Sequence, residues 1–147
     1  LSGGEAADTL DGGGGGNDTQ FGGGGDDYIF AVLGGDSVDG GAGVDTLDTT
    51  SFAGDYLVDL ATGLSNFGGE RFDGMEAVFA GLGNDTLVGN AAGNLMRGGF
   101  GSDSISGAAG VDTLEGGDGN DQLRGQGDFD SVLGGDGADT ILGDDFD

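Results

Sequence analysis

Apolar side chains recur every nine residues along much of the chain, and each lies between small polar residues and runs of glycine. One such residue among β-forming neighbours, as in DTLE at 112–115, predicts a short strand that buries a single side chain. The glycine runs between them predict turns. The pattern therefore predicts an all-β chain in which turns and short strands alternate. The apolar positions are Leu10, Ile29, Val38, Leu47, Leu87, Met96, Ile105, Leu114, Leu123, Val132 and Ile141.

The repeating unit has the form G-G-x-G-x-D-x-U-x, where U is apolar, and its positions are numbered here as places one to nine. The eighth place is apolar in eleven of the twelve units, and the exception, Gln20, predicts a polar hole in the core. Glycine is the residue that adopts positive φ at no steric cost, so the first places predict a tight turn. The units begin at Gly3, Gly13, Gly22, Ala31, Gly40, Ala80, Gly89, Gly98, Gly107, Gly116, Gly125 and Gly134.

The sixth place is an aspartate in eleven units and an asparagine in the other. A position that keeps a carboxylate through so many units is the candidate for the chemistry of the array. The twelve residues are Asp8, Asp18, Asp27, Asp36, Asp45, Asp85, Asn94, Asp103, Asp112, Asp121, Asp130 and Asp139.

Composition narrows the function classes. The 147 residues contain 39 Gly, no Pro, Cys or His, and 28 acidic against 3 basic residues, for a net charge of −25. This charge excludes nucleic acids and anionic membrane surfaces as partners and favours multivalent cations. Disulfides and thiolate or imidazole metal sites have no residues to form them. Disordered chains share this composition, but they have no reason to keep twelve units in phase, so the periodicity favours a folded array.

Stacked units would place their sixth-place aspartates about 4.8 Å apart, the spacing of neighbouring strands. Two such charges repel by roughly 3 kcal/mol at an effective dielectric constant near 20. A hard dication reverses the sign of this interaction, and calcium accepts six to eight oxygens in irregular geometry more readily than magnesium. We therefore expect a chain that folds only when it binds several calcium ions.

The unit resembles the RTX (repeats-in-toxin), haemolysin-type calcium-binding nonapeptide repeat over residues 1–48 and 80–147. The resemblance implies a right-handed parallel β-roll, a β-helix or solenoid with two units per coil, turns at places one to six and strands at places seven to nine. It also implies calcium between the turns of units two apart, held by the twelve sixth-place residues and by turn carbonyls. Those carbonyls belong to Gly22, Gly25, Gly40, Gly43, Gly81, Gly83, Gly98, Gly101, Gly107, Gly110, Gly116, Gly119, Gly134 and Gly137.

The two edges of such a roll are not equivalent in the second half. The units at 80, 98, 116 and 134 have glycine at place four and aspartate at place six. The units at 89, 107 and 125 carry Ala92 and Asp128 at place four in the first and third, and Asn94 at place six in the first. We expect the better calcium ladder on the first edge, at Asp85, Asp103, Asp121 and Asp139.

Residues 49–79 interrupt the repeats. YLVDL at 56–60 predicts a longer strand, MEAVF at 75–79 a second strand, and Arg71 is expected to pair with Glu70 or Glu76. We expect repeat block 1–48, this segment and repeat block 80–147 to form one continuous domain, part of a longer array because neither end shows a cap. The aromatic residues are interpreted as core, with an exposed patch for sugars or protein as the alternative: Phe52, Tyr56, Phe67, Phe72 and Phe79.

No enzymatic signature appears in the sequence. Without Lys there is no P-loop, no EF-hand loop is present, and Ser or Thr nucleophiles lack a His or Lys base. The sequence holds neither a signal peptide nor an apolar run long enough to cross a bilayer. The resemblance favours a calcium-binding module of a secreted bacterial protein exported by type I secretion. The alternatives are a self-associating surface layer, adhesin stalk or filament, and the non-catalytic part of a secreted hydrolase, epimerase or toxin.

Overall fold

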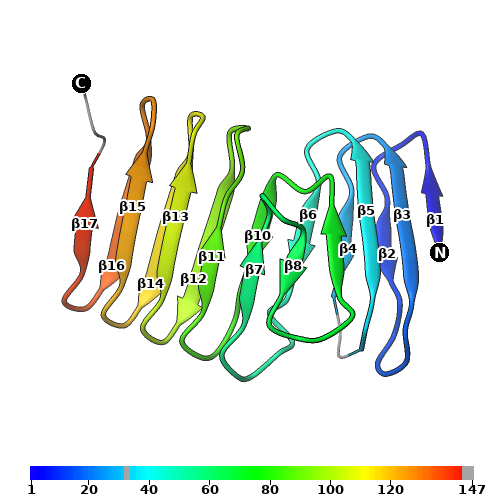
Figure 1. Cartoon of the computed structure of the whole chain (residues 1–147), viewed down its shortest axis with the longest axis horizontal. Helices are drawn as coiled ribbons and strands as arrows, with labels where there is room; N and C mark the ends of the chain where they lie inside the picture. Colours follow the sequence, from blue (N-terminus) through cyan, green and yellow to red (C-terminus); the bar gives the residue numbers. More distant parts are fainter. Residues whose placement is uncertain (32–33, 144–147) are drawn as a thin grey trace.

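The computed structural model describes residues 1–31 and 34–143, which form two sheets that face each other along the length of the molecule (Figure 1). The ten-stranded sheet has the order β1(Ser2–Gly4), β3(Thr19–Gly24), β5(Ser37–Ala42), β9(Arg71–Asp73), β8(Leu64–Ser65), β7(Leu57–Asp59), β11(Thr86–Val88), β13(Ser104–Ala108), β15(Gln122–Gln126) and β17(Thr140–Leu142). The seven-stranded sheet has the order β2(Thr9–Asp11), β4(Tyr28–Phe30), β6(Thr46–Asp48), β10(Ala77–Phe79), β12(Leu95–Phe100), β14(Thr113–Asp118) and β16(Ser131–Asp136). Within these residues no helix is long and apolar enough to cross a membrane.

Within the repeats the chain alternates between the two sheets, one unit to each, so that two units make one coil. Strands two units apart pair in parallel and in register: Leu87 lies beside Ile105, Ile105 beside Leu123, and Leu123 beside Ile141. This 18-residue register stacks every place of a unit on the same place of the next coil. The expected all-β parallel solenoid with two units per coil is confirmed.

The core is a double row of eighth-place side chains between the sheets. Those of nine units are at most 4 % exposed, and Gln20 is fully buried among them. Gln20 donates from Nε2 to the Phe30 carbonyl at 3.2 Å, while its Oε1 has no partner, so the predicted polar hole is present. The nine residues are Leu10, Ile29, Val38, Leu47, Leu87, Met96, Ile105, Leu114 and Leu123.

The repeat strands are longer than three residues at several units. β12, β14 and β16 each run for six residues and include places one to three, where the expectation was a turn. Gly99 and Gly117 at place two adopt φ of 108° and 118° and still pair with the same place of the next coil. Glycine thus bends the strand toward the turn without leaving the hydrogen-bonded ladder.

The interrupting segment continues both sheets instead of separating them. β7 spans only 57–59, shorter than the predicted strand, because the chain then turns back through β8, which pairs antiparallel with β7 and β9. β10 confirms the second predicted strand and lies between β6 and β12.

The aromatic residues of this segment fill a wider cross-section. Tyr56 and Phe72 are buried, and Phe52 and Phe67 pack on the core with ring centroids 4.9 Å apart. Phe79 differs, because its ring lies on the outer face beneath the guanidinium of Arg97, 4.8 Å from the ring centroid. The core interpretation is therefore confirmed for Phe52, Tyr56, Phe67 and Phe72, but Phe79 is not part of the core.

Candidate metal sites along two edges

The turns of the repeats gather along two edges of the solenoid, one for each direction of crossing between the sheets. Turns that lead into the ten-stranded sheet form the Asp103 edge, with sixth-place residues Asp18, Asp36, Asp85, Asp103, Asp121 and Asp139. Turns that lead into the seven-stranded sheet form the Asp112 edge, with Asp8, Asp27, Asp45, Asn94, Asp112 and Asp130. The structure therefore places all twelve sixth-place residues in two stacks, with units two apart as neighbours.

Each stacked carboxylate uses its two oxygens differently. Asp121 Oδ1 accepts the backbone N–H of Asp103 at 2.8 Å, and Asp103 Oδ1 accepts that of Asp85 at 2.7 Å. The second oxygen is buried and has no hydrogen-bond partner in seven of these residues: Asp27, Asp45, Asp85, Asp103, Asp112, Asp121 and Asp130. A buried carboxylate oxygen without a partner is costly, so these atoms point to a missing ligand.

Backbone carbonyls lie beside the unpartnered oxygens. A Cβ added to Gly98 would lie less than 3.0 Å from both Asp103 Oδ2 and the carbonyl oxygen of Gly116 in the next turn. The same pair of oxygens surrounds Gly116, where Asp121 Oδ2 and the Gly134 carbonyl approach. On the other edge the Gly125 carbonyl takes this place beside Asp112 Oδ2, which sequence reasoning did not include.

The place-four glycines stack closely but differently. A Cβ on Gly101 would lie less than 3.0 Å from the Gly83 carbonyl, and one on Gly119 would meet the Gly101 carbonyl in the same way. These residues therefore set how closely successive turns approach, while the place-one carbonyls lie nearest the carboxylates.

The electrostatics of the edges disfavour bare carboxylates. Burial raises the pKa of Asp103 to about 6; the N–H of Asp85 offsets this in part, and the charges of Asp85 and Asp121 raise it further. Burial also raises the pKa of Asp85 and Asp112. A carboxyl whose pKa is higher in the fold than in the unfolded chain destabilises the fold as it ionises, here as pH rises through about 6. At neutral pH a bound cation would remove this cost.

The donor set is one that suits a hard cation. Within residues 1–31 and 34–143 no three carboxylates converge on one point, so each ion would depend on backbone carbonyls as well. Carboxylate and carbonyl oxygens are the ligands of Ca²⁺, which tolerates irregular geometry, while Mg²⁺ demands a near-ideal octahedron. The residues present therefore fit calcium.

The two edges differ in strain. On the Asp112 edge, Ala108, Gln126 and Asp128 adopt φ of 79°, 80° and 67°, a region that costs an L-residue about 1–2 kcal/mol. Asn94 also departs from the pattern, because its Nδ2 donates to Asn90 Oδ1 at 3.3 Å and to the Glu76 carbonyl at 3.4 Å. The turns at 98–103 and 116–121 place glycine at the corresponding positions.

Two glutamates of the interrupting segment occupy sixth places that sequence reasoning missed. In the strand register Arg71 lies beside Ser37, so Glu70 lies beside Asp36 in the neighbouring coil. In the same way Ala77 lies beside Thr46, so Glu76 lies beside Asp45. Counting back two residues from the buried Phe72 and Val78 would have found both. Arg71 binds neither of them and forms an exposed ion pair with Asp73 at 2.9 Å, so the expected pairing is wrong.

In the interrupting segment, hydroxyl groups take the place of a cation on the Asp103 edge. Tyr56 occupies the sixth place in the coil that precedes Asp85. The Tyr56 N–H donates to Asp85 Oδ1 at 2.8 Å. The Tyr56 hydroxyl donates to Glu70 Oε2 at 2.6 Å, and the Ser65 hydroxyl donates to the same oxygen. Burial, and then the hydrogen bond to Glu70, raises the pKa of Tyr56, which keeps the hydroxyl protonated as a donor.

The Tyr56→Phe change removes this donor, and we expect it to destabilise the fold by about 1–3 kcal/mol because the buried Glu70 loses a charge-assisted hydrogen bond. Tyr28→Phe is the matched control: Tyr28 is only half-buried, so water can replace its hydroxyl as the donor to Asp48 Oδ2, whereas the Tyr56–Glu70 bond is buried. Thermal unfolding in calcium measures both variants. Equal losses in the two would contradict a special role for the Tyr56–Glu70 pair.

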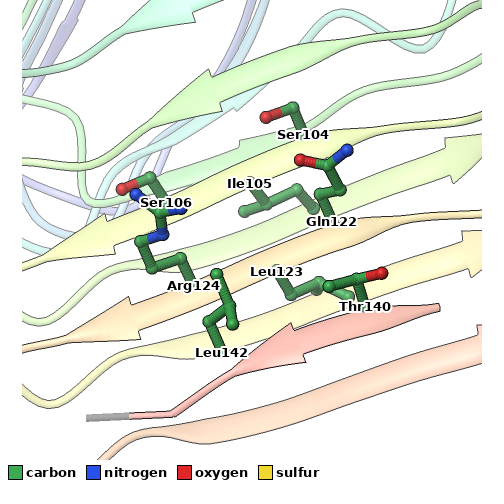
Figure 2. Close-up of a pocket in the computed structure, with 8 residues that line it drawn as sticks. All are labelled: Ser104, Ile105, Ser106, Gln122, Leu123, Arg124, Thr140 and Leu142. Atoms are coloured by element: carbon green, nitrogen blue, oxygen red, sulfur yellow. The ribbon is translucent and has the colours of Figure 1, made fainter. Parts of the chain in front are cut away.

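A shallow pocket lies on the outer face of the ten-stranded sheet, over β13, β15 and β17 (Figure 2). Hydroxyl, amide and guanidinium groups line it, from Ser104, Ser106, Gln122, Arg124 and Thr140. Its lining contains no carboxylate, so it differs chemically from the edges and offers a cation no negatively charged ligand.

The comparisons with known proteins agree with this geometry. The family profile of the RTX calcium-binding nonapeptide repeat matches four times, at residues 1–29, 13–47, 79–114 and 115–147. No curated protein matches the chain. The repeats of this family are calcium-binding motifs, and the matched residues contain all twelve sixth-place residues that form the edges. The chain belongs to the RTX calcium-binding nonapeptide repeat family.

Proposed function

We propose that this chain is a structural module that folds around several calcium ions. The observation that carries the proposal is the set of seven buried Oδ2 atoms without a partner, all at sixth places and facing the turns. Each ion would be held by one such oxygen, by the sixth-place carboxylate of the next turn and by turn carbonyls. The proposed ligands are the twelve sixth-place residues and the turn glycines named above, together with Gly125.

The Asp103 edge is proposed as the tighter of the two in the second repeat block. Its turns at 98–103 and 116–121 use glycine wherever φ is positive, whereas the Asp112 edge holds three other residues there. Strain of this kind reduces the free energy that calcium binding leaves for folding. At limiting calcium, the sites formed by Asp85, Asp103, Asp121 and Asp139 would therefore bind calcium first.

The cellular role follows from the calcium supply. Extracellular modules bind calcium at roughly 10⁻⁴–10⁻³ M, so a chain of this charge would stay unfolded in the cytosol and fold outside the cell. An unfolded acidic chain suits export by type I secretion, and we place this module in a secreted bacterial protein. We propose that its three segments form one continuous domain and that any catalytic activity belongs to other parts of the polypeptide.

Asp121→Asn tests the ligand assignment. Asp121 is 1 % exposed and its Oδ2 has no partner, so we expect the variant to bind at least one calcium ion fewer per chain. Asp118→Asn removes the same charge at an exposed residue three positions earlier and should bind the full number. Equilibrium dialysis against radioactive calcium counts the ions. Equal counts in both variants would contradict the assignment.

The alternative function is self-association into a surface layer or filament, and it predicts a different response to calcium. A surface layer or filament would grow when calcium is added, and a module would remain monomeric. Light scattering of the wild-type chain in millimolar calcium separates the two, because a filament scatters more with time and a monomer does not.

A further inference from the structure

The turn at 74–76 links β9 to β10 on the Asp112 edge and belongs to a unit that is three residues shorter than the repeats. The buried residues on either side of it, Phe72 and Val78, are six positions apart, whereas eighth-place residues of successive repeats are nine apart. The register of β10 with β6 nevertheless puts Glu76 beside Asp45, at a sixth place. Gly74 takes the role of a place-one glycine, because a Cβ on Gly40 would lie less than 3.0 Å from its carbonyl oxygen.

The contacts of Asp45 repeat those of a regular unit. The Asp45 N–H donates to Glu76 Oε2 at 3.0 Å, as the Asp27 N–H donates to Asp45 Oδ1 at 2.8 Å. Asp45 is fully buried, its Oδ2 has no partner, and it lies 2.6 Å from the point where a Cβ on Gly40 would be. The unpartnered oxygen and the Gly74 carbonyl thus approach the same point, next to a second carboxylate.

We propose that Asp45, Glu76 and the Gly74 carbonyl hold a further divalent cation, a calcium ion that joins the first repeat block to the interrupting segment. The inference rests on the proposed function, since it assigns to this turn the same ligand pattern as the regular turns. Glu76 has one more methylene than aspartate, which lets a three-residue turn present its carboxylate at the same level.

The hydrogen bonds of the pair leave one carboxylate oxygen of each residue without a partner. Asp45 Oδ2 is buried and accepts no hydrogen bond. Glu76 Oε2 is engaged by the Asp45 N–H, and no hydrogen bond among the described residues engages its Oε1. One carboxylate oxygen of each residue therefore remains for a ligand.

The column of sites on this edge is interrupted between Glu76 and the next turn. Asn90 Nδ2 donates to the Met75 carbonyl and Asn94 Nδ2 donates to the Glu76 carbonyl, both at 3.4 Å. The side-chain amides of Asn90 and Asn94 thus donate hydrogen bonds to the carbonyls of this turn, which are then engaged without a cation. On the opposite edge the hydroxyls of Tyr56 and Ser65 bind Glu70, so the interruption carries the extra ion on the Asp112 edge alone.

Glu76→Gln is the test. Glutamine keeps an oxygen to accept the Asp45 N–H but loses the charge, so a purely structural Glu76 would leave calcium binding unchanged. We expect the variant to bind one ion fewer than the wild type at saturating calcium, by equilibrium dialysis against radioactive calcium. Glu115→Gln is the matched control, because Glu115 lies on the outer face and pairs with Arg97 at 3.0 Å. It should bind the full number.

The outcomes separate this inference from the proposed function. A full count in Glu76→Gln overturns the extra site, while the loss of ions in Asp121→Asn still upholds the calcium ladder. A wild-type chain that binds no calcium overturns the ladder itself. Should Glu76→Gln weaken folding, higher calcium refolds the remaining sites, so one ion fewer at saturation supports the site and a full count refutes it.

Discussion

Millimolar calcium is expected to fold the calcium-free chain at pH 7. In EDTA the far-ultraviolet circular dichroism should be that of an unfolded chain, and calcium should produce a β-sheet spectrum in one cooperative transition. The cause lies in the two aspartate stacks, where each pair of bare charges about 4.8 Å apart costs roughly 3 kcal/mol at an effective dielectric constant near 20. Several such pairs exceed the stability of an ordinary domain, which is about 5–15 kcal/mol.

Calcium supplies the opposing free energy by mass action. An ion that binds the folded chain alone stabilises it by about 2.7 kcal/mol when its concentration is a hundred times the Kd. Because each site joins two successive turns, the ions add to the strand hydrogen bonds and core contacts that couple neighbouring coils. Binding at one site therefore favours the next, which makes the transition cooperative.

Two controls separate binding from charge screening. Sodium chloride at the same ionic strength screens the exposed charges but supplies no ligand for the buried oxygens, so it should leave the chain unfolded. Magnesium should fold it only weakly, because it dehydrates reluctantly and fits a six-oxygen octahedron best. A full β-sheet spectrum in EDTA at pH 7 would refute calcium-dependent folding.

The regular part of the molecule follows from the sequence because its period is strict. A nine-residue unit with one apolar place can bury that residue only by stacking on equivalent units, so Leu87, Ile105 and Leu123 lie in one row. The same register forces the sixth-place aspartates into two stacks. Spacing thus predicted the all-β array and its candidate carboxylates, while the coil of two units and the ligand roles came from the resemblance to the RTX repeat.

The sixth places of the interruption were not predictable, because this segment keeps the register of the repeats while changing their turns. Glu76 and Glu70 replace aspartate, and the turn before Glu76 has lost three residues, so the unit cannot be recognised by its glycines. Asn94 is the opposite case, a residue that the sequence pattern includes but whose contacts differ from those of the other sixth-place residues. It fits the unit at the sixth place, but its Nδ2 donates to the side chain of Asn90 at place two. Hydrogen bonds between side chain and turn become visible only in three dimensions.

Gly119→Ala is expected to destabilise the calcium-loaded fold by about 3 kcal/mol or more. Gly119 adopts a φ of 143°, and strain at such a position costs about 1–3 kcal/mol for other residues. Its new Cβ would lie less than 3.0 Å from the carbonyl carbon and oxygen of Gly101 in the preceding turn. Backbone atoms cannot rotate away as a side chain would, so the turns must separate, and overpacking of this kind costs a further 1–3 kcal/mol or so.

Thermal unfolding in millimolar calcium should show this as a Tm lower by roughly 6–12 °C, since 1 kcal/mol corresponds to about 2–4 °C in a chain of this length. Gly14→Ala is the matched control: it lies in a turn of the same edge, and its Cβ would meet nothing within 4 Å. It should change the stability by about 0.5 kcal/mol at most, as surface substitutions usually do.

The calcium dependence of Gly119→Ala distinguishes a packing defect from a ligand defect. Separating the turns at 98–103 and 116–121 pulls the Gly116 carbonyl and Asp121 away from Asp103 Oδ2, so the site between these turns should weaken together with the fold. We therefore expect a higher calcium midpoint as well as a lower Tm. A lower Tm with an unchanged calcium midpoint would mean that the close stacking of place-four glycines serves packing alone and that the ions are held elsewhere.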